Sequence, residues 1–466
     1  MRRTALVLAL SLLVASPLQA RQPTRVGDAA MAQAVTLRDA ALGDDTGWKI
    51  TESLTTEVGP RLAGSEADAR AVEWAKAKFR QLGYDKVWTE PVTFPKWVRR
   101  SEHGEVLGAH AQKLVLTALG GSIGGTVEAE VVRFPDLAAL QAAPAGSLAG
   151  KIAFVDYQMQ AARDGSDYRN SGGIRGSGPS AAIRKGAIGF LMRSAGTATS
   201  RSPHTGATRY EQGLQPIPAA ALSTIDAAQL ARLVALGPTR VRLALDCGFD
   251  GEYTSHNVIG EITGRSRPRE IVLIGGHLDS WDHGTGAIDD AAGVAISMAA
   301  GALVKPLRPA RTIRVVAFAN EEQGLFGGRA YADKYGKDVA RHVIAAESDF
   351  GAGRIYAFDS SARDAQPDVM KQFMQVLAPL GIEWAPGQGG AESDIGPIAA
   401  RGMAWGSLSH DGTHYFDLHH NADDTLDKID PKDLAQNVAA YAVFTWLASE
   451  ARGDFGSAPK APEAGR

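Results

Sequence analysis

Apolar and polar positions follow two different patterns along the chain, and the change comes near residue 258. From there on, short β-branched runs alternate with longer segments of helical periodicity. The predicted strands are 258–262, 270–276, 312–319, 342–347 and 402–408, and the predicted helices are 289–304, 324–337, 367–379 and 431–449. This alternation is typical of a mixed, mostly parallel sheet with helices on both faces. The second half of the chain therefore predicts an α/β fold.

The first half of the chain has a different pattern. Two predicted helices at 36–57 and 66–82 precede a region, 101–250, in which short apolar runs dominate. Within it we expect strands at 113–119, 126–134, 151–157, 187–192 and 241–245, helices at 181–185 and 226–236, and polar loops at 158–180 and 194–215. The region has no evident cluster of metal ligands, and His204 and Tyr210 are expected at its surface. We therefore predict an α+β module inserted into the α/β domain.

The chain begins with the pattern of an export signal. Two basic residues, Arg2 and Arg3, precede an apolar run at 5–15 and a small-residue cleavage site that ends at Ala20. Cleavage there would give a periplasmic or secreted protein. The apolar run is too short to span a bilayer comfortably, and no later stretch is expected to be apolar enough. The sequence therefore predicts no stable membrane anchor.

The 466 residues are enough for two or three domains. We expect a signal peptide, a first segment of the α/β domain, the inserted module, a second segment of the α/β domain and a disordered tail, at 1–20, 21–100, 101–250, 251–455 and 456–466. Lysine plus arginine (49) nearly balances aspartate plus glutamate (52), and no basic run contains interleaved aromatic residues, which argues against nucleic-acid binding. Cys247 is the sole cysteine, so no intramolecular disulfide can form.

A concentrated group of chemically active side chains follows the predicted strand 270–276. His277 and Asp279 come directly after it, and Asp289 and Asp290 follow a loop rich in glycine. Imidazole and carboxylate groups at the end of a strand are suitable ligands for a divalent metal. Asp279 can accept a hydrogen bond from the second ring nitrogen of His277 and fix its tautomer. The alternative is an ordinary strand-to-helix loop in which Asp289 caps the helix.

Further acids and histidines follow other predicted strands of the α/β domain, namely Glu321, Glu322, Asp349, His419 and His420. The carboxyl ends of parallel strands share one edge of a sheet, and ligands bind at that edge in such folds. Each residue alone also fits an ordinary role, such as a solvated charge at a helix start or a turn cap. Together they bring enough carboxylates and imidazoles to one edge for a metal centre.

This inventory fits two zinc ions, which need one bridging carboxylate and a histidine with a carboxylate for each ion. Asp289 can bridge the two ions. The other ligands then form two pairs, His277 with Asp349 and Glu322 with His420. Glu321 is left free beside a ligand, where it can act as general base on a metal-bridging water. Manganese or cobalt could occupy the same ligands.

Several short motifs resemble those of the co-catalytic di-zinc exopeptidases and, within that family, the carboxypeptidase Q subfamily. They are GHLDSWD (276–282), GAIDD (286–290), NEEQ (320–323), ESD (347–349), HH (419–420), DT (424–425), GPRLAG (59–64), WTEP (88–91) and SPHTG (202–206). The resemblance covers nearly all of the chain after the signal segment. It implies that 101–250 is a protease-associated domain, that the ligands and Glu321 have the roles given above, that the Asp289–Asp290 peptide bond is cis, and that the protein is a homodimer.

His419 and His420 are adjacent, and we expect only one of them to bind zinc. In the family the ligand lies four residues before an acidic residue, which selects His420 by counting back from Asp424. Neighbouring side chains on an extended segment point to opposite sides, so the ring of His419 is expected to point away from the ion. His419 then either donates a hydrogen bond to the oxyanion of the reaction, a role also open to Tyr415, or is only packed.

The predicted function is zinc-dependent exopeptidase cleavage of dipeptides or short peptides, with Glu321, Asp279 and His419 as the catalytic group. An aminopeptidase with the same metal site is the alternative, because Asp394 and His283 could bind either end of a peptide. An inactive binding protein of the receptor type is disfavoured, since all the ligand types and the base are present. Glutaminyl cyclisation on a related fold is disfavoured by the inserted module.

Overall fold

The computed structural model describes residues 23–391 and 393–457. The expected signal peptide, 1–20, lies outside the described residues, as does most of the expected tail, of which only 456 and 457 are described.

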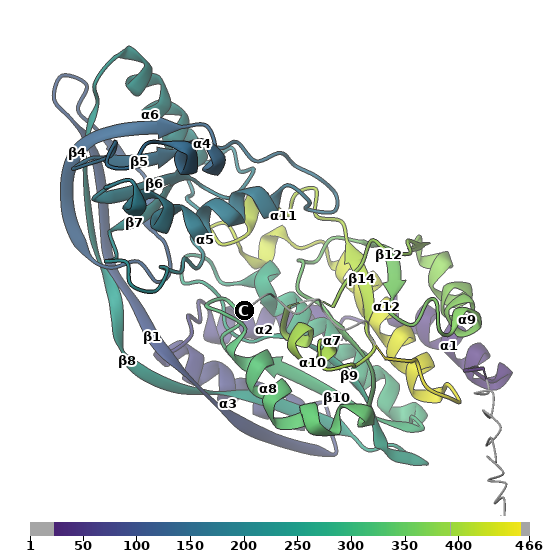
Figure 1. The fold of residues 1–466 in the computed structure, drawn as a ribbon. Helices are drawn as coiled ribbons and strands as arrows, with labels where there is room; N and C mark the ends of the chain where they lie inside the picture. Colours follow the sequence, from purple (N-terminus) through teal and green to yellow (C-terminus); the bar gives the residue numbers. More distant parts are fainter. Residues whose placement is uncertain (1–22, 392, 458–466) are drawn as a thin grey trace, which may run out of the picture.

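A mixed sheet of 11 strands runs through both halves of the molecule (Figure 1). Along its main path the order is β11-β9-β10-β8-β4-β5-β6-β7-β3, and β1 pairs with β8 and β2. The strands are β1 (Lys86–Leu107), β2 (Gln112–Leu114), β3 (Leu116–Ala118), β4 (Gly125–Phe134), β5 (Ile152–Val155), β6 (Gly189–Arg193), β7 (Ala219–Leu222), β8 (Arg240–Ile262), β9 (Arg267–His277), β10 (Arg311–Phe318) and β11 (His342–Glu347). The neighbours β11, β9 and β10 are parallel, as are β4, β5, β6 and β7, whereas β8 is antiparallel to each of its partners.

Helices cover both faces of the β11-β9-β10 end of this sheet, which confirms the predicted α/β class. Alternate residues of a strand point to opposite faces. Val272 and Ile274 of β9 share a core with α1 (Asp28–Ala41), α2 (Thr46–Ser53), α3 (Glu66–Gln81), α7 (Ala292–Val304), α9 (Pro367–Leu377) and α12 (Pro431–Glu450). Leu273, between them, faces the other core, which includes residues of α8 (Phe326–Tyr335) and α10 (Gly396–Ala399).

Strands β1 and β8 form a long antiparallel ribbon that joins the two halves of the molecule. Their pairing runs from Lys86 opposite Glu261 to Leu107 opposite Arg240. In Figure 1 the ribbon follows the left side of the molecule, from the lower half that contains β9 and β10 to the upper half that contains β4 to β7. The expected domain boundaries at 101 and 250 therefore fall inside continuous strands.

The inserted region contains α4 (Leu137–Ala142), α5 (Tyr168–Arg184) and α6 (Thr224–Leu236). The loop expected at 158–180 is wrong for most of its length, because residues from Tyr168 onward belong to helix α5. The low helix propensity of the glycines and of Pro179 hid a helix whose buried positions, such as Ile174 and Ala181, are fixed by tertiary packing. The surface position expected for His204 is also wrong, since its side chain is 1% exposed.

Two other expectations in the α/β domain need correction. The helix expected at 36–57 is divided, with α1 ending at Ala41 and α2 beginning at Thr46, because Gly43 interrupts the apolar pattern. The strand expected at 402–408 is β14 (Gly406–His410), and it belongs to a separate sheet of order β13-β12-β14 rather than to the main sheet. In that sheet β12 is Ile355–Ser360 and β13 is Glu383–Trp384.

The stretch Ala287–Leu307 is long and apolar enough to cross a membrane, which corrects the expectation that no later stretch would be. Its most apolar window is 89% buried in the structure. Helix α7 lies within this stretch and packs against α12, α2 and β9. The stretch therefore contributes the central helix of the core.

Candidate metal centre

The end of β9 places His277 between two carboxylates. Its Nε2 lies 3.0 Å from Asp289 Oδ1 and 3.2 Å from Asp349 Oδ1. Its Nδ1 lies 3.0 Å from the main-chain oxygen of Asp279. A carbonyl oxygen can only accept a hydrogen bond, so Nδ1 carries a proton, and the neutral form of the ring would present a lone pair at Nε2.

His420 repeats this arrangement on the other side of Asp289. Its Nε2 lies 3.1 Å from Asp289 Oδ2 and 2.9 Å from Glu322 Oε2. Its Nδ1 lies 3.3 Å from the main-chain oxygen of Thr205, which comes from the inserted region. The two oxygens of Asp289 thus face two different histidines, and this is the position that a bridging carboxylate needs.

Both histidine–carboxylate groups need a positive charge to balance their carboxylates. A lone pair on Nε2 that faces two carboxylate oxygens at these distances is repelled by them unless positive charge lies between. Burial lowers the pKa of both imidazoles, but the facing carboxylates outweigh it and raise the pKa of His277 well above its usual value and that of His420 to about 9. Asp289 Oδ2 and Glu322 Oε1 are buried without a hydrogen bond to any described residue. The donor set therefore fits zinc, which binds imidazole nitrogen and carboxylate oxygen.

Glu321 precedes Glu322 and is close enough to Asp349 to interact with its charge. Burial raises its pKa well above the usual value, and the nearby negative charge of Asp349 adds to the effect. The main-chain N–H of Glu321 donates to Asp279 Oδ1 at 3.0 Å. We expected the Asp279 carboxylate to accept a hydrogen bond from His277 Nδ1, but it lies 3.6 Å away. The main-chain oxygen of Asp279 accepts this hydrogen bond instead, so the expected acceptor is wrong. The carboxylate instead fixes the segment that carries Glu321.

The expectation that His419 and His420 point to opposite sides is wrong. Their rings are stacked, with centroids 3.4 Å apart, and His419 Nε2 also approaches Asp289 Oδ2, at 3.5 Å. The cause is the left-handed backbone of His420, with φ of 63°, which replaces the extended conformation assumed from the sequence. His419 follows the short helix α11 (Tyr415–Leu418), and its Nδ1 is buried with no hydrogen bond to any described residue.

Three site residues were not identified as such from the sequence. Asp290 accepts hydrogen bonds from the main-chain N–H groups of His277 and Gly293, so it holds the start of α7, a role the sequence suggested for Asp289. The peptide bond between Asp289 and Asp290 is cis, as the resemblance implies. Asp424 Oδ1 accepts from the N–H groups of Ala287 and Ile288, each at 2.7 Å.

Arg61 is the third such residue and is completely buried. Its guanidinium donates to the main-chain oxygens of Leu278 at 2.6 Å, Thr285 at 2.6 Å and Gly286 at 2.9 Å. These oxygens belong to the loop between His277 and Asp289. Arg61 and Asp424 each lie in a motif that carried the resemblance, which was the available signal for both of them.

The two residues considered for binding a peptide end lie in different places. His283 Nε2 is 2.8 Å from Thr117 Oγ1, and its Nδ1 is 3.2 Å from Arg99 Nη2. Asp394 is buried, and its Oδ1 accepts from the main-chain N–H of Gly328 at 2.7 Å. Neither residue belongs to the two candidate metal-binding groups of the described chain, which are Asp289–His419–His420 and His277–Asp289–Asp349.

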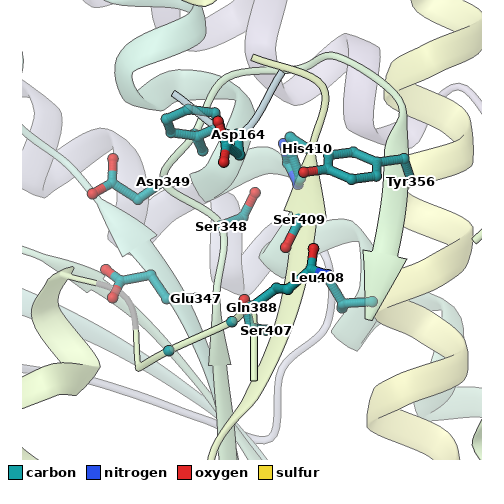
Figure 2. Close-up of a pocket in the computed structure, with 13 residues that line it drawn as sticks. Asp164, Glu347, Ser348, Asp349, Tyr356, Gln388, Ser407, Leu408, Ser409 and His410 are labelled. Atoms are coloured by element: carbon teal, nitrogen blue, oxygen red, sulfur yellow. The ribbon is translucent and has the colours of Figure 1, made fainter. Parts of the chain in front are cut away.

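A cavity of about 440 Å³ opens beside Asp349. Figure 2 shows Glu347 and Asp349 on one side of it and Tyr356, Ser409 and His410 on the other. Asp164, from the inserted region, also lines the cavity. A cavity of this size, with acidic groups next to a metal-binding cluster, is suitable for a small polar ligand.

Residues 257–445 match the family model "Peptidase family M28". The chain is 32% identical to carboxypeptidase Q of Mus musculus over 85% of this chain and 84% of that protein. A crystal structure described as a peptidase M28 precursor from Shewanella amazonensis SB2B is 48% identical, with a TM-score of 0.88 over 90% of this chain and 96% of that one. An aminopeptidase from Aneurinibacillus sp. strain AM-1, 21% identical with a TM-score of 0.62 over 93% of this chain and 98% of that one, shares the fold. The chain therefore belongs to peptidase family M28, a family of zinc metallopeptidases, and is a hydrolase of peptide bonds.

Proposed function

We propose that the protein is an exopeptidase that holds two zinc ions and cleaves dipeptides or short peptides. His277 and Asp349 would hold one ion, Glu322 and His420 the other, and Asp289 would bridge them. The observation that carries the proposal is the pair of Nε2 atoms that each face two carboxylate oxygens, with Nδ1 bonded to a main-chain oxygen. A proton on each Nδ1, donated to the main-chain oxygen, would leave the Nε2 lone pair of both neutral rings available for a metal.

The residues around the ions would divide the work of hydrolysis. When bound, zinc polarises the scissile carbonyl and lowers the pKa of water at the site. Glu321 accepts the proton of the attacking water and delivers it to the leaving amine, a role that its raised pKa favours. Asp279 holds the segment of Glu321 through the main-chain N–H. His419 donates a hydrogen bond to the oxyanion, and the buried hydroxyl of Tyr415 is the second candidate for that role.

The surroundings of the site support a short substrate. The cavity beside Asp349 has the size of a small-ligand site, which suits a short peptide, and Asp164 and Glu347 in its lining suit a free ammonium group. The relative carboxypeptidase Q acts, by its name, at the carboxyl end of its substrates. A dipeptide has its free amino end and its free carboxyl end on either side of a single peptide bond. We therefore favour a dipeptide over a longer aminopeptidase substrate.

The domain roles follow the same proposal. We infer that 101–250 is a protease-associated domain that roofs the cleft, since Asp164 and Thr205 of this region reach the site. Segments 21–100 and 251–455 would then form the peptidase domain. We further propose export after cleavage near Ala20, no stable membrane anchor, and a homodimer.

The test is hydrolysis of one dipeptide beside its N-acetylated and C-amidated forms, each with and without a zinc chelator. The proposal requires chelator-sensitive cleavage of the free dipeptide and little cleavage of either blocked form. Cleavage of the amidated form alone would favour an aminopeptidase, and cleavage of the acetylated form alone a carboxypeptidase. Turnover that a chelator leaves unchanged would contradict the metal-dependent mechanism.

A further inference from the structure

Two segments that are far apart in the chain meet beside His420. Residues 200–205 of the inserted region lie against the segment that follows α11. The main-chain N–H of Thr205 donates to the main-chain oxygen of His420 at 3.0 Å, and the N–H of Ala422 donates to Ser202 Oγ at 3.2 Å. The inserted region therefore contacts the metal-binding loop both at His420 and just after it.

His204, the residue before Thr205, extends this contact with its ring. Its Nε2 lies 3.0 Å from Asn421 Nδ2. The Asn421 amide also donates through Nδ2 to the main-chain oxygen of Asp417, at 2.8 Å, and accepts at Oδ1 from the N–H of Asp423, at 2.8 Å. These two main-chain partners fix the orientation of the amide, so Nδ2 is the donor and His204 Nε2 is the acceptor.

The His204 ring is itself fixed by the inserted region. It is buried, and the main-chain N–H of His204 donates to Ser194 Oγ at 2.8 Å, directly after β6. A Cβ on Gly196 would lie 2.2 Å from Cε1 of the ring, so the ring packs against the main chain there. Burial lowers the pKa of the ring to about 3, and this effect exceeds the opposing one of the His419 main chain. A neutral ring in a fixed position is a suitable acceptor for Asn421.

We propose that His204 is a positioning residue for the zinc site of His420, an inference that rests on the proposed two-zinc centre. It would act through Asn421, the next residue after His420. The backbone of His420 is left-handed, with φ of 63°, and a histidine keeps this conformation only where its surroundings enforce it. The hydrogen bonds to His204 and Thr205 hold that backbone from the side of the inserted region.

The two zinc sites differ in this support. His277 is oriented by the peptidase half, because its Nδ1 lies 3.0 Å from the main-chain oxygen of Asp279 and its loop is bonded to Arg61. His420 depends on residues 200–205 as well. The inserted region would therefore control the binding of one ion, whereas the other would be held by the peptidase half.

The test compares His204→Phe, which keeps a ring but has no acceptor, with His204→Gln, whose side-chain oxygen can accept from Asn421. The control is His110→Phe, at an exposed position of the inserted region. Zinc affinity is measured by competition with a chelator. For His204→Phe we expect the Kd of one ion to rise about 10–100-fold, the usual cost of losing a group that orients a metal ligand, and the Kd of the other to stay unchanged. His204→Gln should recover much of the affinity, and His110→Phe should behave as the wild type.

The affected ion is identified in variants that keep one site. In His277→Ala, which should retain the ion of His420, adding His204→Phe should weaken the binding of that ion. In His420→Ala, adding His204→Phe should leave the affinity for the remaining ion unchanged. Asn421→Ala removes the donor in place of the acceptor and should give the same pattern, so the test does not depend on the folding of one variant.

Three results would overturn the inference: His204→Phe weakens both ions equally, weakens neither, or weakens only the ion that His420→Ala retains. Equal weakening with a lower stability of the metal-free protein in urea would make His204 an ordinary packing residue. In each of these cases a wild type with two ions would leave the two-zinc centre intact. A wild type that binds one ion would contradict the two-zinc proposal and this inference with it.

Discussion

His277 and His420 have the same environment, although they come from segments far apart in the chain. Each Nδ1 is bonded to a main-chain oxygen and each Nε2 faces two carboxylates. Asp289 is common to the two environments, since one of its oxygens faces His277 and the other faces His420. A proton on each Nε2 would also place positive charge between the ring and the two carboxylates. Direct measurement of bound metal therefore distinguishes a metal-loaded site from one with two protonated histidines.

Glu321→Gln should keep zinc and lose most of the activity. The amide has nearly the same shape as the carboxylate but cannot take a proton from water, and general acid–base catalysis is typically worth about 10²–10⁴-fold. We expect kcat to fall by that factor while zinc content stays at the wild-type level. The same change at the exposed Glu73 on α3 is the control. Normal turnover by Glu321→Gln would show that another group is the base.

His419→Ala separates a donor from a metal ligand. His419 lies farther from Asp289 Oδ2 than His420 does, at 3.5 Å against 3.1 Å, so we expect the variant to retain both zinc ions. If His419 is the oxyanion donor, kcat should fall about 10²–10³-fold, which is the usual cost of one such donor. Unchanged kcat would leave Tyr415 as the donor, and loss of zinc would make His419 a ligand.

At the level of elements, the loop between His277 and Asp289 is held from outside by Arg61 and Asp424. The loop has little regular structure of its own, and its main-chain oxygens point to the Arg61 guanidinium. Asp424 binds the N–H groups at the end of the loop. These two side chains thus set the distance between a histidine and the carboxylate that it faces.

Arg61→Met should destabilise the protein through this loop. Three carbonyl oxygens, those of the buried residues Leu278 and Gly286 and of the half-buried Thr285, would lose a charged donor. Hydrogen bonds to charged groups contribute about 1.5–3 kcal/mol each before the loop relaxes. We expect the free energy of unfolding to fall by about 2–4 kcal/mol in urea titrations of metal-free protein. The exposed Arg70, changed to methionine, is the matched control. A change below about 0.5 kcal/mol would mean that Arg61 does not support the loop.

The sequence predicted the strands of the main sheet better than the loops that complete the site. The runs at 270–276, 312–319 and 342–347 are apolar and bounded by polar residues, so their ends, and the residues that follow them, could be placed. The stacked arrangement of His419 and His420 could not be, because a left-handed backbone at a histidine has no signal in a hydrophobic pattern. Helix α5 was missed because its glycines mask a helix that packing stabilises.

At the level of the whole molecule, the inserted region and the peptidase half share one sheet and one site. Strand β8 pairs with β10 on one side and β4 on the other, so the sheet passes from one half to the other without interruption. Two contacts join Thr205 of the inserted region to His420. The main-chain oxygen of Thr205 accepts from His420 Nδ1, and the main-chain N–H of Thr205 donates to the main-chain oxygen of His420 at 3.0 Å. Local patterns along the chain reveal neither the continuity of the ribbon nor this contact, because both join residues that are distant in sequence.

Removal of metal should lower the stability of the whole chain. Zinc that binds only the folded state stabilises it by mass action, by about 2.7 kcal/mol at a concentration one hundred times its Kd. For a chain of this size, 2.7 kcal/mol corresponds to about 3 °C in Tm, so we expect a chelator to lower Tm by about 3–6 °C for one to two ions and added zinc to restore it. Scanning calorimetry checks this. An unchanged Tm would show that the acidic cluster is stable without a metal and would weaken the case for a structural contribution of zinc.

The most direct test of the account is the number of zinc ions per chain after removal of metal and reconstitution with zinc, measured by elemental analysis. We expect two ions in the wild type, about one in His277→Ala and in His420→Ala, and fewer than one in Asp289→Ala, because Asp289 serves both ions. A wild type that binds one ion, or histidine variants that both retain two, would contradict the two-zinc centre.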